Sequence, residues 1–358
     1  MLTLQADGKV SSNFLPFSCL TFPAVLSSIS RMPELSVFEP PHGGLPTPRT
    51  ATGEKQKKIK TQPFVLRPKH HAILRAVYQY HLLTNELLGK AVGYSEKSLA
   101  EVQRLTRQLK LNEYVLSLEV PVIRGKAPLV YTLSRKGLKY LAAAGFDIRN
   151  YFRPCKETEK GYLFLQHTLA LNDFLIAASR LANSAPNYSL SSFIHERTLK
   201  QTPFKIAVVR SVGGQVQEEP VTLIPDAFLD FRCALASGTA AKIPVLLELD
   251  RGTIEQKNFR KKIRAYTEFI KNEGYKKAFA IKSVTVAFAT TAGQKRLSQM
   301  RDWARKELAA TYEKGWLSNL FLFTALPPKL EPKQLFCAPV WYQPFDDETP
   351  VSLLAAGK

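Results

Sequence analysis

The first patterned stretch of the chain has its hydrophobic positions at the spacing of three short helices. Residues 70–80 place their apolar side chains on one stripe, and residues 83–93 and 95–109 repeat the pattern. Thr84 and Ser95 lie at the start of the second and third segments, where a side-chain oxygen can accept a hydrogen bond from one of the first free amide groups of a helix. The pattern therefore predicts three consecutive helices.

Two apolar segments follow the third helix, with the basic loop Arg124-Gly125-Lys126 between them, and a helix with Ser134 as its cap comes next. Three helices followed by a β-hairpin in this order resemble a winged helix-turn-helix. The resemblance covers residues 64–145, within a predicted domain of residues 64–150. It implies that helix 95–109 enters a major groove of DNA while the hairpin lies beside the phosphates.

The resemblance also implies a set of DNA-binding side chains on the exposed face of that helix and in the hairpin loop. The set comprises Lys97, Ser98, Arg104, Arg107, Arg124 and Lys126. Such side chains mostly contact phosphates, so they position a protein on DNA without specifying a sequence. The alternative is that the charges form the solvated face of a helical domain that mediates dimer contacts, because winged helices also serve as protein-binding modules.

Beyond this region the pattern alternates between helices and strands. The predicted helices are 161–182, 253–272 and 294–313. The predicted strands are 189–197, 221–232, 241–250, 284–291 and 320–326. The first helix is apolar on nearly all sides, which indicates burial against a sheet, and Thr253 and Gln256 form a capping box at the start of the second. The order predicts an α/β domain over residues 151–330 with a central mixed sheet, in a chain that is α+β overall.

Acidic side chains occur at the ends of the predicted strands. Glu248 and Asp250 are two residues apart in one strand, so the strand's period of two places both on the same face. Asp226 lies near the start of the neighbouring strand, and Glu196 lies at the end of the first strand. We expect these carboxylates to converge at one rim of the sheet.

A Pro-Asp pair on one strand and Glu-x-Asp on the next resemble the restriction-endonuclease-like core known as PD-(D/E)xK. A winged helix followed by HTLALNDF, a Glu, PDA, ELDRGT and a helix with KI..Y resembles the bacterial replication-relaxation family, over residues 64–326. The nuclease resemblance implies that Asp226, Glu248 and Asp250 bind Mg²⁺ through carboxylate oxygens. The ion would then activate water for cleavage of a phosphodiester.

The sequence departs from the nuclease pattern at Asp250, where an active enzyme of this fold usually has a lysine. Catalysis is therefore an open question. Asp250 is a third metal ligand in one interpretation, and Lys262 of the following helix supplies the cation in another. A helix that starts at Thr253 places Lys262 roughly 13 Å along its axis, which argues against the second interpretation. The catalytic candidates are Glu196, Asp226, Glu248, Asp250 and Lys262.

A structural interpretation of the same residues stays open. The two carboxylates of the Glu-x-Asp pair then form ion pairs with Arg251 or a helix cation, and Asp226 is a turn residue after a proline. Within HTLALNDF, His167 and the pair Asn172-Asp173 are expected to pack the helix rather than to take part in catalysis.

The charge and the cysteine content of the chain limit which binding partners and which cellular compartment are expected. The 358 residues carry a net charge of +20, and most of the excess of Lys and Arg falls in the two predicted domains, which favours double-stranded DNA as a partner. The four cysteines lie far apart and form no CxxC pair, which argues against zinc or disulfide frameworks and favours a reducing cytoplasm. The apolar residues 14–30 are interrupted by two prolines, which disfavours a signal peptide and a membrane span. We expect a bacterial cytoplasmic protein without a membrane partner.

The two ends of the chain differ from its middle. Residues 1–63 are rich in Pro, Gly and Thr near their end and predict a flexible arm, or a mis-annotated start with Met32 as the true first residue. Residues 331–358 form a Pro-rich tail that either docks back onto the core or engages a partner.

Three functions stay open at this point. The favoured one, which the family resemblance implies, is a DNA-binding accessory protein of plasmid or mobile-element replication, relaxation and mobilisation. Its partners would be a plasmid relaxase or a replication initiator, and a homodimer is an open alternative to a monomer. The second is a Mg²⁺-dependent endonuclease, and the third is a winged-helix transcriptional regulator. The DNA sequence that is bound cannot be read from these residues.

Overall fold

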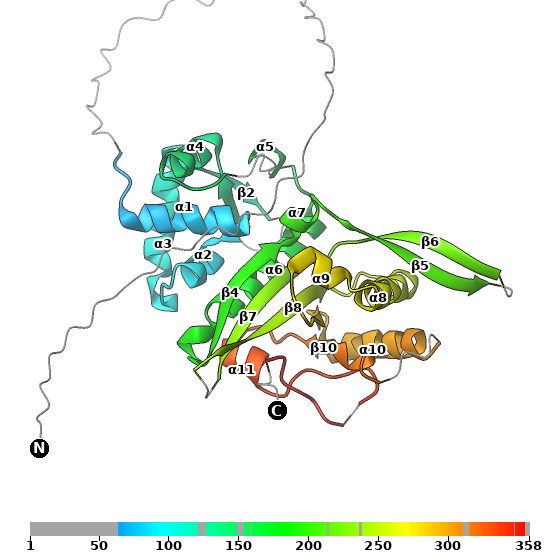
Figure 1. Ribbon diagram of the computed structural model, residues 1–358. Coiled ribbons are helices and arrows are strands. Elements are labelled where there is room, and N and C mark those ends of the chain that lie inside the picture. Colours follow the sequence, from blue (N-terminus) through cyan, green and yellow to red (C-terminus); the bar gives the residue numbers. More distant parts are fainter. Residues whose placement is uncertain are drawn as a thin grey trace, which may run out of the picture. The chain divides into compact units, whose positions relative to one another are not determined.

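The first described elements are helices around a small sheet (Figure 1). They are α1 (Pro68–Tyr80), β1 (Leu83–Thr84), α2 (Asn85–Ala91), the 3-10 turn η1 (Glu96–Ser98), α3 (Leu99–Leu111), β2 (Val115–Glu119), β3 (Leu129–Leu133) and α4 (Arg135–Ala143). β3 lies between β1 and β2 and is antiparallel to both. The computed structural model describes residues 64–120, 127–148, 154–157, 159–212, 215–235, 238–310, 315–346 and 348–354. The predicted arm of residues 1–63 and the loop residues Arg124 and Lys126 lie outside them, and the winged-helix interpretation stays a prediction.

Two of the four predicted helix caps are present. The Thr84 hydroxyl accepts a hydrogen bond from the Leu87 amide at 3.3 Å, and the Ser134 hydroxyl accepts one from the Gly137 amide at 3.0 Å. The prediction for Ser95 is wrong. Its hydroxyl lies 3.0 Å from the hydroxyl of Ser98, and a 3-10 turn separates it from α3. The neighbouring hydroxyl replaces the free amide as its hydrogen-bond partner.

The rest of the described chain is an α/β arrangement. Its elements are α5 (Pro154–Glu157), α6 (Tyr162–Ser179), η2 (Leu181–Asn183), β4 (Tyr188–His195), α7 (Glu196–Leu199), β5 (Phe204–Val212), β6 (Gln215–Leu223), β7 (Ala227–Ala234), β8 (Ala240–Asp250), α8 (Gln256–Lys271), α9 (Gly274–Phe279), β9 (Thr285–Thr290), α10 (Gly293–Ala310), η3 (Ser318–Leu320), β10 (Phe321–Ala325) and α11 (Pro332–Cys337). The central sheet has the order β10-β9-β8-β7-β4. β8, β9 and β10 are parallel, whereas β7 is antiparallel to both of its neighbours. The predicted α/β fold with a central mixed sheet is confirmed.

Helices cover both faces of this sheet, and β8 shows how the strand period assigns its side chains. Leu247 and Leu249 belong to the core that includes α6, while Leu246 belongs to the core that includes α8 and α10. Glu248 and Asp250 are in phase with Leu246, so they face α8 and α10. The prediction that the two carboxylates share a face is confirmed by their contacts with those helices.

The predicted strand 221–232 is wrong as a single element. The chain leaves β6 at Leu223 and starts β7 at Ala227, with Pro225 and Asp226 between them. β6 pairs with β5 in a separate two-stranded ribbon, which reaches beyond α8 in Figure 1. The apolar alternation of Phe204, Ile206 and Val208 is the signal by which the sequence could have revealed this ribbon.

The predicted capping box at Thr253 and Gln256 is also wrong. α8 begins at Gln256, and its N-cap is Glu255. The carbonyl of Ile254 instead accepts a hydrogen bond from Arg296 of α10 at 2.6 Å. This tertiary contact holds the segment before α8 as a loop, and the loop forms part of the pocket described below.

The helix α6 joins the first helices to the central sheet. The Asn172 side-chain amide donates to the carbonyls of Tyr80 at 2.9 Å and Leu82 at 2.7 Å, and Asp173 forms an ion pair with Lys90 at 2.8 Å. The expected packing role of Asn172-Asp173 is thereby confirmed. These contacts agree with the assignment of residues 62–358 to one compact unit.

The C-terminal tail docks onto the core. Trp341 is fully buried, and its indole donates to the carbonyl of Leu335 at 2.7 Å. Tyr342 pairs with Phe323 of β10, and Leu354 donates to the carbonyl of Phe336 at 3.0 Å. Among the described residues, no helix has the combined length and apolar character that crossing a bilayer requires.

Candidate functional site

A pocket of about 360 Å³ lies at the C-terminal end of β8. Its charged and titratable lining residues are His167, Asp226, Glu248, Asp250, Arg251 and Lys262. Phe164, Phe259 and Phe288 supply apolar walls. All three carboxylates predicted as metal ligands therefore line one pocket, although their partners differ.

Glu248 is held by two residues of α8. One carboxylate oxygen accepts a hydrogen bond from the Lys262 ammonium, and the other accepts one from the Tyr266 hydroxyl, both at 2.5 Å. The side chain is 5% exposed. Burial raises the pKa of Glu248, the charge of Asp226 acts in the same direction and Lys262 opposes both, and the net result is a pKa of about 7.

The expectation that Lys262 lies too far along its helix is wrong. Because α8 begins at Gln256, Lys262 lies only about 9 Å along the axis, and the helix packs on the sheet face that Glu248 occupies. Burial lowers the pKa of Lys262, but the charges of Glu248 and Asp226 outweigh burial and leave the pKa raised. Lys262 is therefore an ammonium at neutral pH, beside the carboxyl groups of Glu248 and Asp226.

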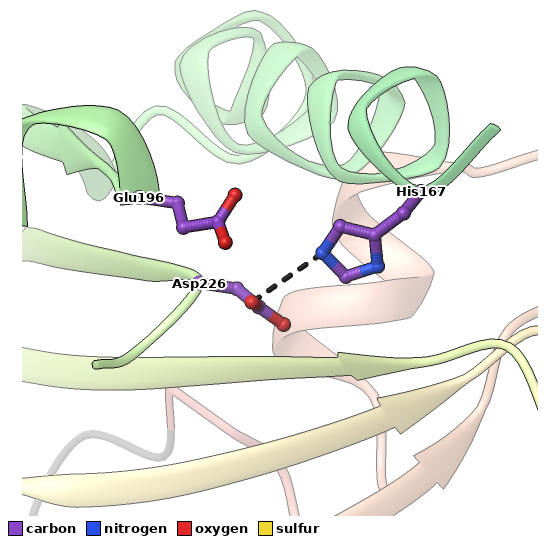
Figure 2. A group of neighbouring side chains, drawn as sticks. All are labelled: His167, Glu196 and Asp226. Atoms are coloured by element: carbon purple, nitrogen blue, oxygen red, sulfur yellow. Dashed lines mark ion pairs between the residues drawn. The ribbon is translucent and has the colours of Figure 1, made fainter. Parts of the chain in front are cut away.

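Asp226 connects Glu248 to a second cluster, shown in Figure 2. One Asp226 oxygen accepts a hydrogen bond from the Leu249 amide at 2.7 Å, and the other lies 3.3 Å from Nε2 of His167. Glu196 completes the cluster, because one ligand atom from each of His167, Glu196 and Asp226 lies within 4.8 Å of the others. This group could hold a metal ion.

The environments of Asp226 and His167 favour an ion pair. Burial raises the pKa of Asp226, but the hydrogen bond and charge of His167 outweigh burial and leave the pKa lowered. Burial lowers the pKa of His167, whereas its hydrogen bond to Asp226 and the nearby carboxylates leave the pKa raised. Besides its place on α6, His167 reaches Asp226 at the acidic end of the sheet, a contact that was not predicted. The signal in the sequence was an imidazole on a largely apolar helix.

His195 lies behind this cluster as a neutral side chain. It is buried, and its Nε2 lies 3.3 Å from the side-chain oxygen of Asn172 while its Nδ1 accepts a hydrogen bond from the Arg197 amide at 3.3 Å. Burial lowers the pKa of His195 to about 3, and the charge of Arg197 adds to this. These bonds fix the start of α7, where Glu196 is the first residue.

Asp250 has a different set of partners. The Arg296 guanidinium donates from Nε to one oxygen at 2.9 Å and from Nη2 to the other at 3.1 Å. The Thr290 hydroxyl at 3.0 Å and the Gly252 amide at 2.9 Å donate to the first oxygen as well. Burial raises the pKa of Asp250, but Arg296 and these hydrogen bonds leave it lowered. The alternative of an ion pair with a helix cation holds for Asp250, and the cation is Arg296 rather than Arg251.

The predicted DNA-binding residues in the described chain lie on and just before α3. Lys97, Arg104 and Arg107 are exposed and Ser98 is half-buried. Arg104 forms an ion pair with Glu101 at 2.7 Å on the surface. An exposed pair of this kind contributes little to stability, so its arginine can exchange partners.

The model of the family described as "Replication-relaxation" matches residues 74–313, which is more than half of the chain. The chain belongs to the replication-relaxation family. Searches of curated proteins and of solved structures gave no match. Membership in the replication-relaxation family supports a role in replication and relaxation. The matched segment contains both the pocket and α3.

Proposed function

We propose that this protein is a DNA-binding accessory factor of plasmid or mobile-element replication and relaxation in the bacterial cytoplasm. Residues 64–150 act as a winged helix-turn-helix domain on double-stranded DNA. The observation that carries the proposal is the division of α3 into two faces. Val102, Leu105 and Leu109 are buried, while Arg104 and Arg107 are exposed.

The charge of the chain supports the same proposal. A net charge of +20 attracts a polyanion, and neutralising phosphates releases counterions, so affinity should fall steeply with salt. Arg104 can leave Glu101 for a phosphate at little cost. A relaxase or a replication initiator is the proposed protein partner, and homodimer formation is a further part of the proposal.

The test is fluorescence anisotropy with a labelled duplex across a range of salt concentrations. We expect the double variant Lys97→Ala/Arg107→Ala to lower the affinity for DNA roughly tenfold. The slope of log affinity against log salt concentration should become shallower by about 2, one for each lost phosphate contact. The matched control is Lys277→Ala/Lys333→Ala, which removes two exposed lysines elsewhere and gives the same net charge. Equal losses in both double variants, or no binding by the unaltered protein, would refute a DNA-binding face on α3.

A metal-dependent endonuclease is a second candidate function, and one observation favours it. Lys262 reaches Glu248 beside Asp226, so an ammonium lies where the missing lysine of the Glu-x-Asp motif would act. When bound, a divalent ion would activate water and offset charge on the cleaved phosphodiester. Lys262 would then orient that water and stabilise the developing negative charge.

The donor atoms fit this second candidate unequally. Asp226 and Glu248 offer carboxylate oxygens that Mg²⁺ accepts, and both line the pocket. Both oxygens of Asp250 are engaged by Arg296, which makes it the least suited of the three proposed ligands. We therefore assign Asp250 a structural role within this proposal.

Supercoiled plasmid tests the second candidate. The protein is incubated with Mg²⁺ or Mn²⁺ and with EDTA, beside Asp226→Asn, Lys262→Met and the control Asp230→Asn. Asp230 is a suitable control because it lies on β7, which begins directly after Asp226, and forms an ion pair with Arg232. Nicking that requires metal and disappears in the first two variants supports an endonuclease. Shifted but intact plasmid in every lane rejects it and leaves the accessory factor.

A further inference from the structure

We propose that His167, Glu196 and Asp226 form a binding site for one divalent transition-metal ion, with Glu248 and Asp250 outside the ligand set. Mn²⁺ is the ion chosen to represent this class. The proposal deepens the second candidate function by naming a ligand set different from the predicted Asp226, Glu248 and Asp250. Metal binding is measured without DNA, so it can succeed or fail independently of nuclease activity.

The three side chains come from three different elements and point toward one another in Figure 2. His167 lies on α6, Glu196 begins α7, and Asp226 precedes β7. Nε2 of His167 is already 3.3 Å from Asp226, and one ligand atom of each residue lies within 4.8 Å of the others. Metal–ligand bonds of about 2.0–2.2 Å require donor atoms about 3–4 Å apart, so small side-chain rotations suffice.

The donor atoms decide the class of ion. An imidazole nitrogen with two carboxylates suits Mn²⁺, Fe²⁺ or Zn²⁺, whereas Mg²⁺ and Ca²⁺ are bound through oxygen. Asp226 and Glu196 together supply two negative charges to balance the ion. The set of three carboxylates expected from the sequence lacks this nitrogen, so the two sets predict different ions.

Neighbouring contacts hold the proposed ligands in place. The Leu249 amide donates to the Asp226 oxygen that faces away from His167, which leaves the other oxygen for the ion. Hydrogen bonds of His195 to Asn172 and Arg197 fix the start of α7, and therefore the backbone of Glu196. Such supporting contacts set the orientation of metal ligands.

The hydrogen-bond and ion-pair partners of Glu196 and Glu248 indicate which of the two is the metal ligand. Glu248 receives hydrogen bonds at both oxygens from residues with side chains at most 29% exposed, so it is already satisfied. Glu196 pairs with Lys200, whose side chain is 43% exposed and can turn into solvent when an ion arrives. A bound ion beside Lys262 would also make this end of the pocket attractive to a phosphate group.

The test is electron paramagnetic resonance of Mn²⁺ titrated into the metal-free, full-length protein without DNA. We expect about one bound Mn²⁺ per chain, loss of affinity of at least a hundredfold in His167→Ala, and a loss of less than about tenfold in Glu248→Gln. Pulsed measurements should detect a ¹⁴N coupling from a ligating imidazole. The coupling should persist in Glu248→Gln, and excess Mg²⁺ should not displace the Mn²⁺.

Circular dichroism establishes that each variant is folded, and His71→Ala is the matched control, since His71 lies on α1 outside the pocket. The proposal is overturned by any of three results. The first is a folded protein that shows no saturable Mn²⁺ binding. The second is bound Mn²⁺ without nitrogen coupling. The third is a greater loss of Mn²⁺ affinity in Glu248→Gln than in His167→Ala, which would indicate that Asp226 and Glu248 are the ligands instead.

Discussion

Glu248 and Asp250 lie two residues apart on the same face of β8, yet their environments differ in almost every respect. Burial, together with the nearby charge of Asp226, raises the pKa of Glu248 to about 7 despite Lys262. The pKa of Asp250 is lowered despite burial, because Arg296 and two further hydrogen-bond donors, the Thr290 hydroxyl and the Gly252 amide, hold its charge. One strand therefore presents an acid that can change protonation near neutral pH and another that stays ionised.

The difference follows from the shape and number of the partners. A guanidinium is planar and matches both oxygens of a carboxylate, and a backbone amide and a hydroxyl complete the set at Asp250. Glu248 has one cation, the Lys262 ammonium, whose charge also acts on Asp226. A carboxylate with several fixed donors stays ionised and stabilises the fold, whereas Glu248 changes its protonation near neutral pH. Glu248 and Asp250 both line the pocket.

Replacing Arg296 by methionine should give the largest effect on stability. Asp250 is 7% exposed, so the variant leaves a buried charge without its cation. We expect the free energy of unfolding to fall by about 3–5 kcal/mol at pH 7, measured by denaturant titration. Adding Asp250→Asn to the variant should restore about half of this loss, since the uncompensated charge is then gone. A loss below about 1 kcal/mol would contradict the structural role of Asp250.

The raised pKa of Glu248 predicts a pH dependence of opposite sign to that of Asp250. Its folded pKa of about 7 exceeds its unfolded value, so the folded state binds more protons and stability should fall as pH rises from 5 to 8. Asp250, with a lowered pKa, contributes stability above its unfolded pKa of about 3.9 and loses it only in more acidic solution. We expect Glu248→Gln to remove a decrease on the order of 2 kcal/mol between pH 5 and pH 8.

The contribution of His167 to the pH dependence of stability must be separated from that of Glu248. The raised pKa of His167 means that its contribution is present below its unfolded pKa and is lost as pH rises, which is the same direction. The informative quantity is therefore the difference in slope between the unaltered protein and Glu248→Gln. An exposed control, Glu255→Gln, should keep the full slope. An unchanged slope in Glu248→Gln would remove the contrast between the two carboxylates.

The sequence predicted the shared face of these carboxylates but not their different partners. The strand period placed Glu248 and Asp250 together because alternation is a property of the backbone. Arg296 lies 46 residues after Asp250, and no local pattern links them. Lys262 was judged too far away because a favourable capping box moved the expected start of the helix to Thr253, and the Arg296–Ile254 hydrogen bond overrides that local preference.

The contact of His167 with Asp226 was not predicted, for a related reason. The position of His167 on an apolar helix suited a packing role, and the sequence held no information on which end of α6 would meet the sheet. Asn172 and Asp173, from the same segment, did prove to be packing residues. Local periodicity thus predicted elements and faces, whereas the pairing of side chains across elements depended on tertiary structure.

Tyr266→Phe should reduce the free energy of unfolding by an intermediate amount, through loss of its hydrogen bond to Glu248. The hydroxyl of Tyr266 donates to one oxygen of Glu248 at 2.5 Å, and its removal leaves a buried acceptor without this donor. We expect a loss of about 1.5 kcal/mol at pH 8, where Glu248 is ionised, and a smaller loss at pH 5.5. Denaturant titration at both pH values gives the measurement, and Tyr275→Phe is the control. Equal losses at the two pH values would show that the hydroxyl does not respond to the charge of Glu248.

Thr290→Val should give the smallest effect, because Asp250 has several donors. The variant removes one hydrogen bond to Asp250, and the amide of Ala292 loses its bond to the same hydroxyl, while Arg296 and Gly252 remain. Valine suits the β9 strand, so we expect a loss of only about 1 kcal/mol at pH 7 in denaturant titration. In Arg296→Met the same substitution should cost more, because the hydroxyl is then one of the two remaining donors. If the losses in free energy of unfolding of the two single variants simply add in the double variant, Thr290 and Arg296 act on Asp250 independently. That result would contradict one cooperative set of donors at Asp250.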